Sequence, residues 1–138
     1  MKSIKYIQDE VKRIGSELCG DSKPKWLFKV PDKPTHDGSP HVEVIGDEYH
    51  YVVTERGSEF ERKRTKDIDE LLFWLVSGDV FELACDWELE HRIEHQDSRR
   101  LMFAKEIEYL EKINSNWASK QKLNHENILK ENPYNDGI

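Results

Sequence analysis

Cysteine is scarce in this chain of 138 residues, which contains only two. Cys19 and Cys85 lie far apart and neither belongs to a C-x-x-C pair, so their spacing supports neither a zinc site nor a disulfide framework. Two free, buried thiols are typical of a protein that stays in the reducing cytoplasm. We therefore predict a cytoplasmic protein, and we expect it to have no cofactor.

Long apolar runs are also missing from the sequence. No segment approaches the length that a membrane-spanning helix requires. The N-terminal stretch MKSIKYIQDEVKR is charged throughout and lacks the apolar centre of a signal peptide. We therefore expect no association with a membrane.

Positive charge is in deficit, with 21 Lys and Arg residues against 28 Asp and Glu residues and a formal net charge of −7. This balance argues against direct binding to nucleic acid, which requires a basic surface. An acidic chain is suited equally to simple solubility and to electrostatic attraction of a basic partner. The 4 Trp, 5 Tyr and 5 Phe residues supply core material that disordered chains lack.

Apolar residues recur at helical spacing from Ile4 to Leu18, which predicts an amphipathic N-terminal helix. Ser3 is suited to cap the start of this helix and Gly20 to end it. The following segment is rich in proline, and only residues 26–30 in it resemble a short strand. The role of the proline-rich loop over residues 31–41 is not indicated by any motif.

Alternating apolar residues over 42–53, with Gly46-Asp47 between them, predict a β-hairpin. Arg56-Gly57-Ser58 indicates a second turn, and the charged segment 59–65 is typical of a strand at a sheet edge.

Helical spacing resumes after Thr65. We expect one helix over residues 68–75, a break at Gly78, and further helices over 80–96 and 99–117. Residues 118–138 are expected to form a weakly ordered tail that is weakly helical over 120–130 and irregular from Pro133. The length predicts a single domain over residues 1–138. Its predicted class is α+β: an N-terminal helix, a three- to four-stranded antiparallel sheet, and C-terminal helices packed on one face.

The segment Asp86–Arg100 is dense in charge, since ten of its fifteen residues can ionise. On ideal helices, several of these residues fall on faces that are otherwise apolar. Glu88 and Arg92 are four residues apart with the acid first, which is the favourable order for an ion pair. An internal salt-bridge network between the two helices is one interpretation, and a polar pocket is the alternative. The residues predicted to point inward are Phe81, Ala84, Cys85, Glu88, Arg92 and His95, followed by Arg99 and Glu106.

A second face of the same segment carries Asp86, Glu90 and Glu94, and its helical continuation reaches Asp97. Charged outer faces are usually solvated surface. The alternative is a docking surface for a basic partner, and we assign Asp86, Glu90 and Glu94 to that hypothesis.

His91 to His95 match the pattern H-x-x-E-H, in which two histidines on one helix bind zinc and the glutamate acts as a base. Three fixed positions arise easily by chance, and the chain offers no evident third ligand. A metal-dependent hydrolase using His91 and His95 is therefore a remote alternative.

Two segments together resemble a known family. The first is Tyr49-His50 followed by Glu55-Arg56-Gly57, in the pattern Y-H-x-x-x-x-E-R-G. The second is Glu88 and Arg92 followed by Asp97, Arg99, Arg100 and Phe103, in the pattern E-x-x-x-R…D-x-R-R-x-x-F. Their order is similar to that of the Immunity protein 63 family of bacterial polymorphic toxin systems, over residues 42–134 and including the closing Pro133-Tyr134.

This resemblance implies an α+β protein that neutralises a cognate toxin by stoichiometric binding and is not an enzyme. The toxins of such systems are diverse and many are nucleases, so a basic nuclease domain is one partner that fits. The runner-up hypothesis is a domain that binds a small molecule or anion in a pocket lined by Arg56, Arg92 and Arg99. In the leading hypothesis, Glu55 and Arg56 join Arg92 and Arg99 in one charge network.

Overall fold

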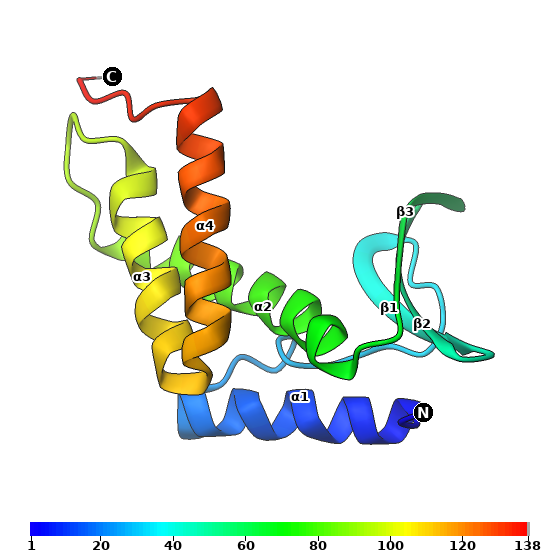
Figure 1. The fold of residues 1–138 in the computed structure, drawn as a ribbon. Coiled ribbons are helices and arrows are strands. Elements are labelled where there is room, and N and C mark those ends of the chain that lie inside the picture. Colours follow the sequence, from blue (N-terminus) through cyan, green and yellow to red (C-terminus); the bar gives the residue numbers. More distant parts are fainter. Residues whose placement is uncertain (138) are drawn as a thin grey trace. The chain divides into compact units, whose positions relative to one another are not determined.

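The computed structural model describes residues 1–137 (Figure 1). Helices make up 55% and strands 18%, which confirms the predicted α+β class with an N-terminal helix, an antiparallel sheet and C-terminal helices. In chain order the elements are α1 (Ile4–Cys19), the 3-10 helix η1 (Gly20–Ser22), β1 (Asp37–Ile45), β2 (Glu48–Glu55), β3 (Ser58–Thr65), α2 (Ile68–Glu90), α3 (Ser98–Ile113) and α4 (Ser115–Glu131).

The chain divides into two compact units, Met1–Val76 and Ser77–Ile138. The first unit contains α1, the three-stranded sheet and the beginning of α2. The second contains the remainder of α2 with α3 and α4. The single domain expected from the chain length stays a prediction.

The N-terminal helix α1 forms where its periodicity predicts it. The Ser3 hydroxyl accepts a hydrogen bond from the Tyr6 N–H at 3.1 Å, and Gly20 ends the helix with a positive φ of 58°. These two positions satisfy backbone groups that a helix otherwise leaves unpaired at its ends. The buried face consists of Ile7, Val11, Ile14 and Gly15.

The strand expected over residues 26–30 does not form. The Leu27 N–H bonds to the Pro24 carbonyl at 3.3 Å in a turn, and Phe28 has a left-handed backbone with φ 59°. Both features interrupt extended pairing. Leu27, Phe28 and Val30 are nevertheless buried, whereas Trp26 is exposed. Phe28 lies so close to Gly15 that its ring leaves no room for a Cβ at that glycine. This loop therefore covers α1 and is not a fourth strand.

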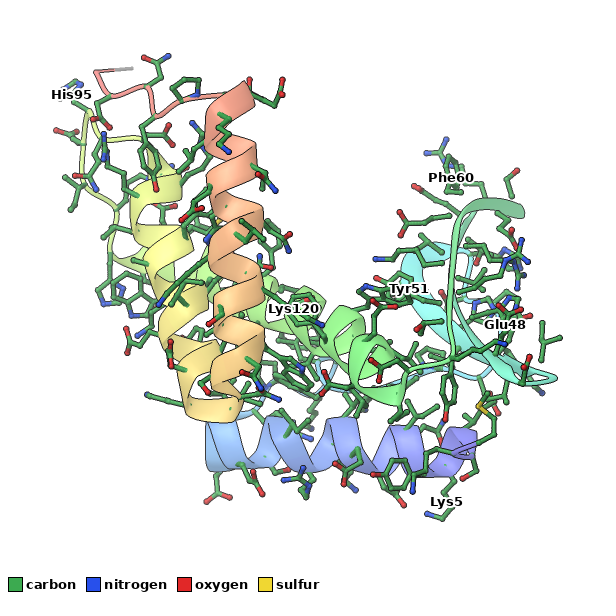
Figure 2. All side chains as sticks on the ribbon, viewed as in Figure 1. Lys5, Glu48, Tyr51, Phe60, His95 and Lys120 are labelled. Carbon is green, nitrogen blue, oxygen red and sulfur yellow. The ribbon has the colours of Figure 1, made fainter. Side chains whose placement is uncertain are left out.

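The sheet is a meander of the order β1-β2-β3 with antiparallel pairing throughout. Gly46-Asp47 forms the predicted hairpin turn between Ile45 and Glu48. The pairing of β2 with β3 is irregular, because Val53 faces Glu61 while Thr54 faces Glu59. Phe60 is consequently an extra, unpaired residue in a β-bulge. Figure 2 shows it at the outer end of β3, where 67% of its surface is exposed.

Helix α2 is continuous over 23 residues, so the predicted break at Gly78 is wrong. A glycine inside a helix costs only about 1 kcal/mol. Burial of Val76 and Val80 on either side of Gly78 outweighs this cost. Among the described residues, no helix combines the length and the apolar character needed to cross a bilayer.

The end of α2 also differs from expectation, since it stops at Glu90 and not near residue 96. The His91 N–H bonds to the Glu88 carbonyl at 3.1 Å, a tight closing bond, and the His91 ring bonds to the Trp87 carbonyl at 2.8 Å. The chain then turns through His95, which has a positive φ of 64° and lies in the connection shown in Figure 2.

A predicted helix over 99–117 is divided into two by Asn114. Its backbone is extended, and its side-chain carbonyl accepts hydrogen bonds from Asn116 N–H and Trp117 N–H, which caps α4. Helix α4 then runs to Glu131, in the segment expected to be a weakly ordered tail. Burial of Trp117, Ala118 and His125 stabilises it beyond its modest helix propensity.

Candidate functional site

The first half of the family-like pattern lies on β2. Tyr49 is buried, and its hydroxyl accepts a hydrogen bond from the Lys2 N–H at 2.7 Å. His50 is also buried, and its Nδ1 lies 2.8 Å from the Arg62 guanidinium. These two side chains therefore fix the sheet to the N-terminus and to β3.

Arg62 is the centre of a polar cluster on the sheet. This cluster was not predicted from the sequence. Besides His50, it contacts Glu43 at 3.2 Å and Glu59 at 2.7 Å. His41, fully buried, bonds to Glu43 at 2.7 Å, and this bond is the main reason that the pKa of Glu43 is lowered. One feature of the sequence indicates this cluster: His41 and Glu43 are two residues apart in a strand. Their side chains therefore lie on the same face of the strand.

Both histidines of this cluster keep one unpaired ring nitrogen. His41 Nδ1 and His50 Nε2 are buried without a hydrogen-bond partner. The nearest carboxylate to His50 Nε2 is Glu48, at 3.9 Å, beyond hydrogen-bond range. Because both histidines are buried, the cluster is a packing feature of the sheet.

The Glu55-Arg56-Gly57 pattern forms the turn between β2 and β3. Glu55 pairs with Ser58, and the two residues between them have φ values of 51° and 82°. Two consecutive positive φ values define a type I′ hairpin turn, which favours glycine at its second central position. The side chains of Glu55 and Arg56 are exposed. The motif therefore specifies a backbone shape and leaves two charges at the surface.

The second half of the pattern begins with an ion pair at the end of α2. Arg92 donates to both carboxylate oxygens of Glu88, at 2.7 and 3.1 Å, as their spacing predicts. Glu88 is 4% exposed, whereas most of the Arg92 side chain faces solvent. The Arg92 guanidinium lowers the pKa of Glu88 and keeps this buried carboxylate charged.

Asp97 joins the start of α3 to the C-terminal segment. Its carboxylate accepts from the Arg99 N–H at 3.0 Å as the helix cap, from the Arg99 guanidinium at 2.8 Å, and from the Asn135 N–H at 2.9 Å. Arg99, followed by these backbone donors, holds the pKa of Asp97 well below its usual range. One buried carboxylate thus connects two segments that are distant in sequence.

Asp136 makes the reciprocal connection from the C-terminal segment. It accepts from the Asp97 N–H at 2.8 Å and pairs with the Arg100 guanidinium at 2.9 Å. Arg99 completes the arrangement by donating to the carbonyls of Asn132 and Pro133. We call this arrangement the C-terminal clasp; its members are Asp97, Arg99, Arg100, Asn132, Pro133, Tyr134, Asn135 and Asp136.

Tyr134 is the aromatic centre of the C-terminal clasp. The Arg100 guanidinium lies 4.1 Å from its ring centroid, and Arg99 lies 5.5 Å away. The centroid of the Phe103 ring lies 6.4 Å from that of Tyr134. Phe103 also stacks on His125 of α4, with 3.9 Å between the ring centroids. The D-x-R-R-x-x-F pattern and the closing Pro-Tyr therefore form one structure. These bonds connect residues 132–136 to the start of α3. The weak order expected of this tail stays a prediction.

The prediction that Arg92 and His95 point inward is wrong, because α2 ends at Glu90 and both residues are exposed. Arg99 and Glu106 have internal partners. Arg99 pairs with Asp97, and Glu106 on α3 is buried against α4, where Gln121 donates to it at 2.9 Å. Glu106 also lies 3.4 Å from the buried His125. This pair was not predicted, because the segment that forms α4 was expected to be only weakly helical. That Glu55 and Arg56 share a network with Arg92 and Arg99 stays a prediction.

The arginine pocket of the runner-up hypothesis finds no support in the second unit, because Arg92 and Arg99 both donate to internal carboxylates. A shallow pocket in the first unit has a different lining, which includes none of the three arginines. It is lined by Met1, Lys2, Tyr49, Lys66 and Ile68.

The H-x-x-E-H residues do not share a helix face, because α2 ends before His91. The His91 ring stacks on Trp87 at 4.1 Å and bonds to its carbonyl. Across residues 1–137, no three histidine, cysteine or carboxylate side chains are grouped so that they could hold a metal ion.

Asp86, Glu90 and Glu94 are all exposed. Asp86 and Glu90 are four residues apart on α2, whereas Glu94 lies in the connection to α3. None of the three forms an ion pair with another described residue. Unpaired acids of this kind contribute nothing to internal packing and are available to a partner.

Residues 46–127 match the family model described as Immunity protein 63. No curated protein and no solved structure gave a match. The matched residues include both sequence patterns and end shortly before the clasp residues at 132–136.

Proposed function

The chain belongs to the Immunity protein 63 family, and we propose that it neutralises a cognate bacterial toxin by binding it stoichiometrically. The observation that carries this proposal is the family match, which extends over more than half of the chain and includes both motif segments. An inhibitor of this type occupies the toxin and requires no catalytic group.

The contacts of the charged motif residues support a role in binding a partner protein over a role in catalysis. Catalytic groups usually combine a perturbed pKa with access to a cleft. Here the carboxylates with the clearest internal partners, Glu88 and Asp97, are bonded to Arg92 and Arg99 and to backbone N–H groups. Their lowered pKa values are accounted for by these contacts, so they stabilise the fold.

We further propose that the partner presents a basic surface and that Asp86, Glu90 and Glu94 meet it in the cytoplasm. Their exposure and the net charge of −7 support this proposal. Complementary charge increases the rate of association and discriminates against wrong partners. A nuclease domain fits this description, because a protein that binds nucleic acid carries a basic surface.

Co-expression with the toxin domain encoded beside this gene tests the proposal. We expect cells that produce the toxin domain to grow only when this chain is present. Growth arrest that persists in its presence would contradict the proposal. As a control for the mode of action, purified toxin should lose activity in proportion to added chain and reach full inhibition at equimolar amounts. Inhibition by a small fraction of that amount would indicate an enzyme.

A further inference from the structure

The outer face of α2 between residues 81 and 90 carries two parallel columns of side chains. The apolar column is Phe81, Cys85 and Leu89, and the acidic column, one position further on, is Glu82, Asp86 and Glu90. Each residue of an ideal helix is rotated by 100° around the axis, so residues four apart differ by only about 40° in direction. Each column therefore runs nearly parallel to the helix axis. We call the two columns together the α2 ridge.

Five of the six side chains of the α2 ridge are exposed although half of the ridge is apolar, and Cys85 is half-buried. Phe81 is 46% and Leu89 is 62% exposed, and the three acids are also at the surface. The face of α2 that is packed in the second unit is a different one, with Val80, Ala84 and Glu88 buried. Helical spacing predicts Phe81 and Cys85 on that inner face. This prediction is wrong for Phe81, because the buried positions are one residue away.

Cys85 completes the apolar column. Its sulfur lies 3.2 Å from the Met102 sulfur, and burial raises the pKa of the thiol, with nearby acids adding to the effect. The thiol therefore stays neutral at physiological pH and behaves as a small apolar side chain. The column is thus apolar over about two and a half helical turns, a length of roughly 14 Å.

We propose that the α2 ridge is the surface that holds the toxin, and that its occupant is a basic protein surface with an apolar strip at its centre. This inference rests on the proposed function. Exposed Phe and Leu side chains provide the apolar anchors that dominate binding energy, and flanking charges exclude water and set orientation. Asp86 and Glu90 in this column favour lysine or arginine opposite them.

Charge complementarity also decides against other occupants. A second copy of this chain would place one acidic column against another, which costs binding energy. Nucleic acid and anionic lipid are repelled for the same reason. A basic protein is the partner class that satisfies both columns at once.

Binding of a catalytically inactive form of the adjacent toxin domain to the full chain tests the α2 ridge. We expect Leu89→Ser to raise the dissociation constant about tenfold or more, because an anchor side chain is lost. The double charge reversal D86K/E90K should raise it by a similar factor, mainly through slower association. Phe60→Ser is the matched control, since it removes an equally exposed apolar side chain from β3 and should leave the affinity within about twofold.

The two proposals fail differently. If the unmodified chain binds and protects, and both ridge variants bind as tightly as it does, the α2 ridge is not the interface and the proposed function stands. If the unmodified chain neither binds nor protects, both proposals fail. Circular dichroism checks that each variant is folded.

Two measurements on the unmodified chain keep the inference testable even if a variant misfolds. The dissociation constant of the complex should rise with salt, because screening weakens contacts of the acidic column. An affinity that does not depend on salt would overturn the inference. Sedimentation of the free chain should show a monomer; a dimer abolished by Leu89→Ser would assign the ridge to a second copy instead.

Discussion

The two motif segments of this chain contain similar charged residues but differ in what those residues contact. In the second unit, Asp97, Arg99 and Arg100 bind the C-terminal segment through ion pairs, backbone bonds and the Tyr134 ring. In the first unit, the side chains of Glu55 and Arg56 extend from a tight turn into solvent. One motif secures a contact between distant segments, and the other specifies a local backbone shape.

This difference shows that a charged motif has to be judged by its partners. Asp97 is buried and has donors on three sides, so its charge is part of the fold. The turn motif depends on Gly57, whose φ of 82° most side chains avoid. The following predictions test whether the two motifs differ in this way.

The largest effect is expected from Asp97→Ala compared with Glu55→Ala. Removing Asp97 leaves the Arg99 guanidinium and the Asn135 N–H without their acceptor and uncaps α3, so we expect the melting temperature to fall by about 5 °C or more. Glu55→Ala should change the free energy of unfolding by less than about 0.5 kcal/mol. Thermal and urea unfolding followed by circular dichroism measure both. Equal losses for the two variants would abolish the distinction.

Acid should weaken the second unit through Asp97 and Glu88. Both carboxyl groups have a lowered pKa in the folded state because of Arg99 and Arg92, respectively. Their stabilisation is therefore complete above the unfolded pKa values of about 4 and is lost as pH falls through the folded values. We expect the amides of residues 135 and 137 to lose hydrogen-exchange protection below roughly pH 4.

Asp97→Asn provides the control for this titration, because the amide cannot ionise. The variant should be less stable at neutral pH and should lose less stability on acidification than the unmodified chain. Undiminished protection of the C-terminal segment at about pH 2 would show that the clasp does not depend on these charges.

The smallest effect is expected from two glycine substitutions that change the free energy of unfolding in opposite directions. Gly57→Ala has room for a Cβ but imposes the positive φ on a residue that disfavours it, so we expect a loss of about 1 kcal/mol. Gly78→Ala lies in the interior of α2, also with room for a Cβ, and should gain about 0.5–1 kcal/mol. Urea unfolding measures both. A gain for Gly57→Ala would contradict the type I′ turn.

Local pattern was a reliable guide wherever neighbouring residues determine the structure. The caps at Ser3 and Gly20, the Gly46-Asp47 turn and the i,i+4 pair of Glu88 with Arg92 were all predicted and are all present. Each of them depends on contacts that span only a few residues. The family resemblance was also readable at this level, because its residues form two short, ordered patterns.

Errors occurred where packing outweighed local preference. Gly78 does not break α2, because Val76 and Val80 beside it are buried. The division at Asn114 has a local cause that was not predicted, since the Asn114 side chain caps α4. The Arg62 cluster and the C-terminal clasp were missed because their members come from different strands or are more than thirty positions apart, as Asp97 and Asp136 are. Neither spacing leaves a periodic signal.

The sequence by itself determined the α+β class, the two hairpin turns, the acidic character and the family to which the chain belongs. These follow from composition, short-range geometry and residue order. Only the tertiary structure decided which charged side chains pair with other groups inside the protein and which remain exposed. Burial and long-range pairing make that choice, since Asp97 and Asp86 have the same side chain, yet one caps a helix under the C-terminal segment and the other faces solvent.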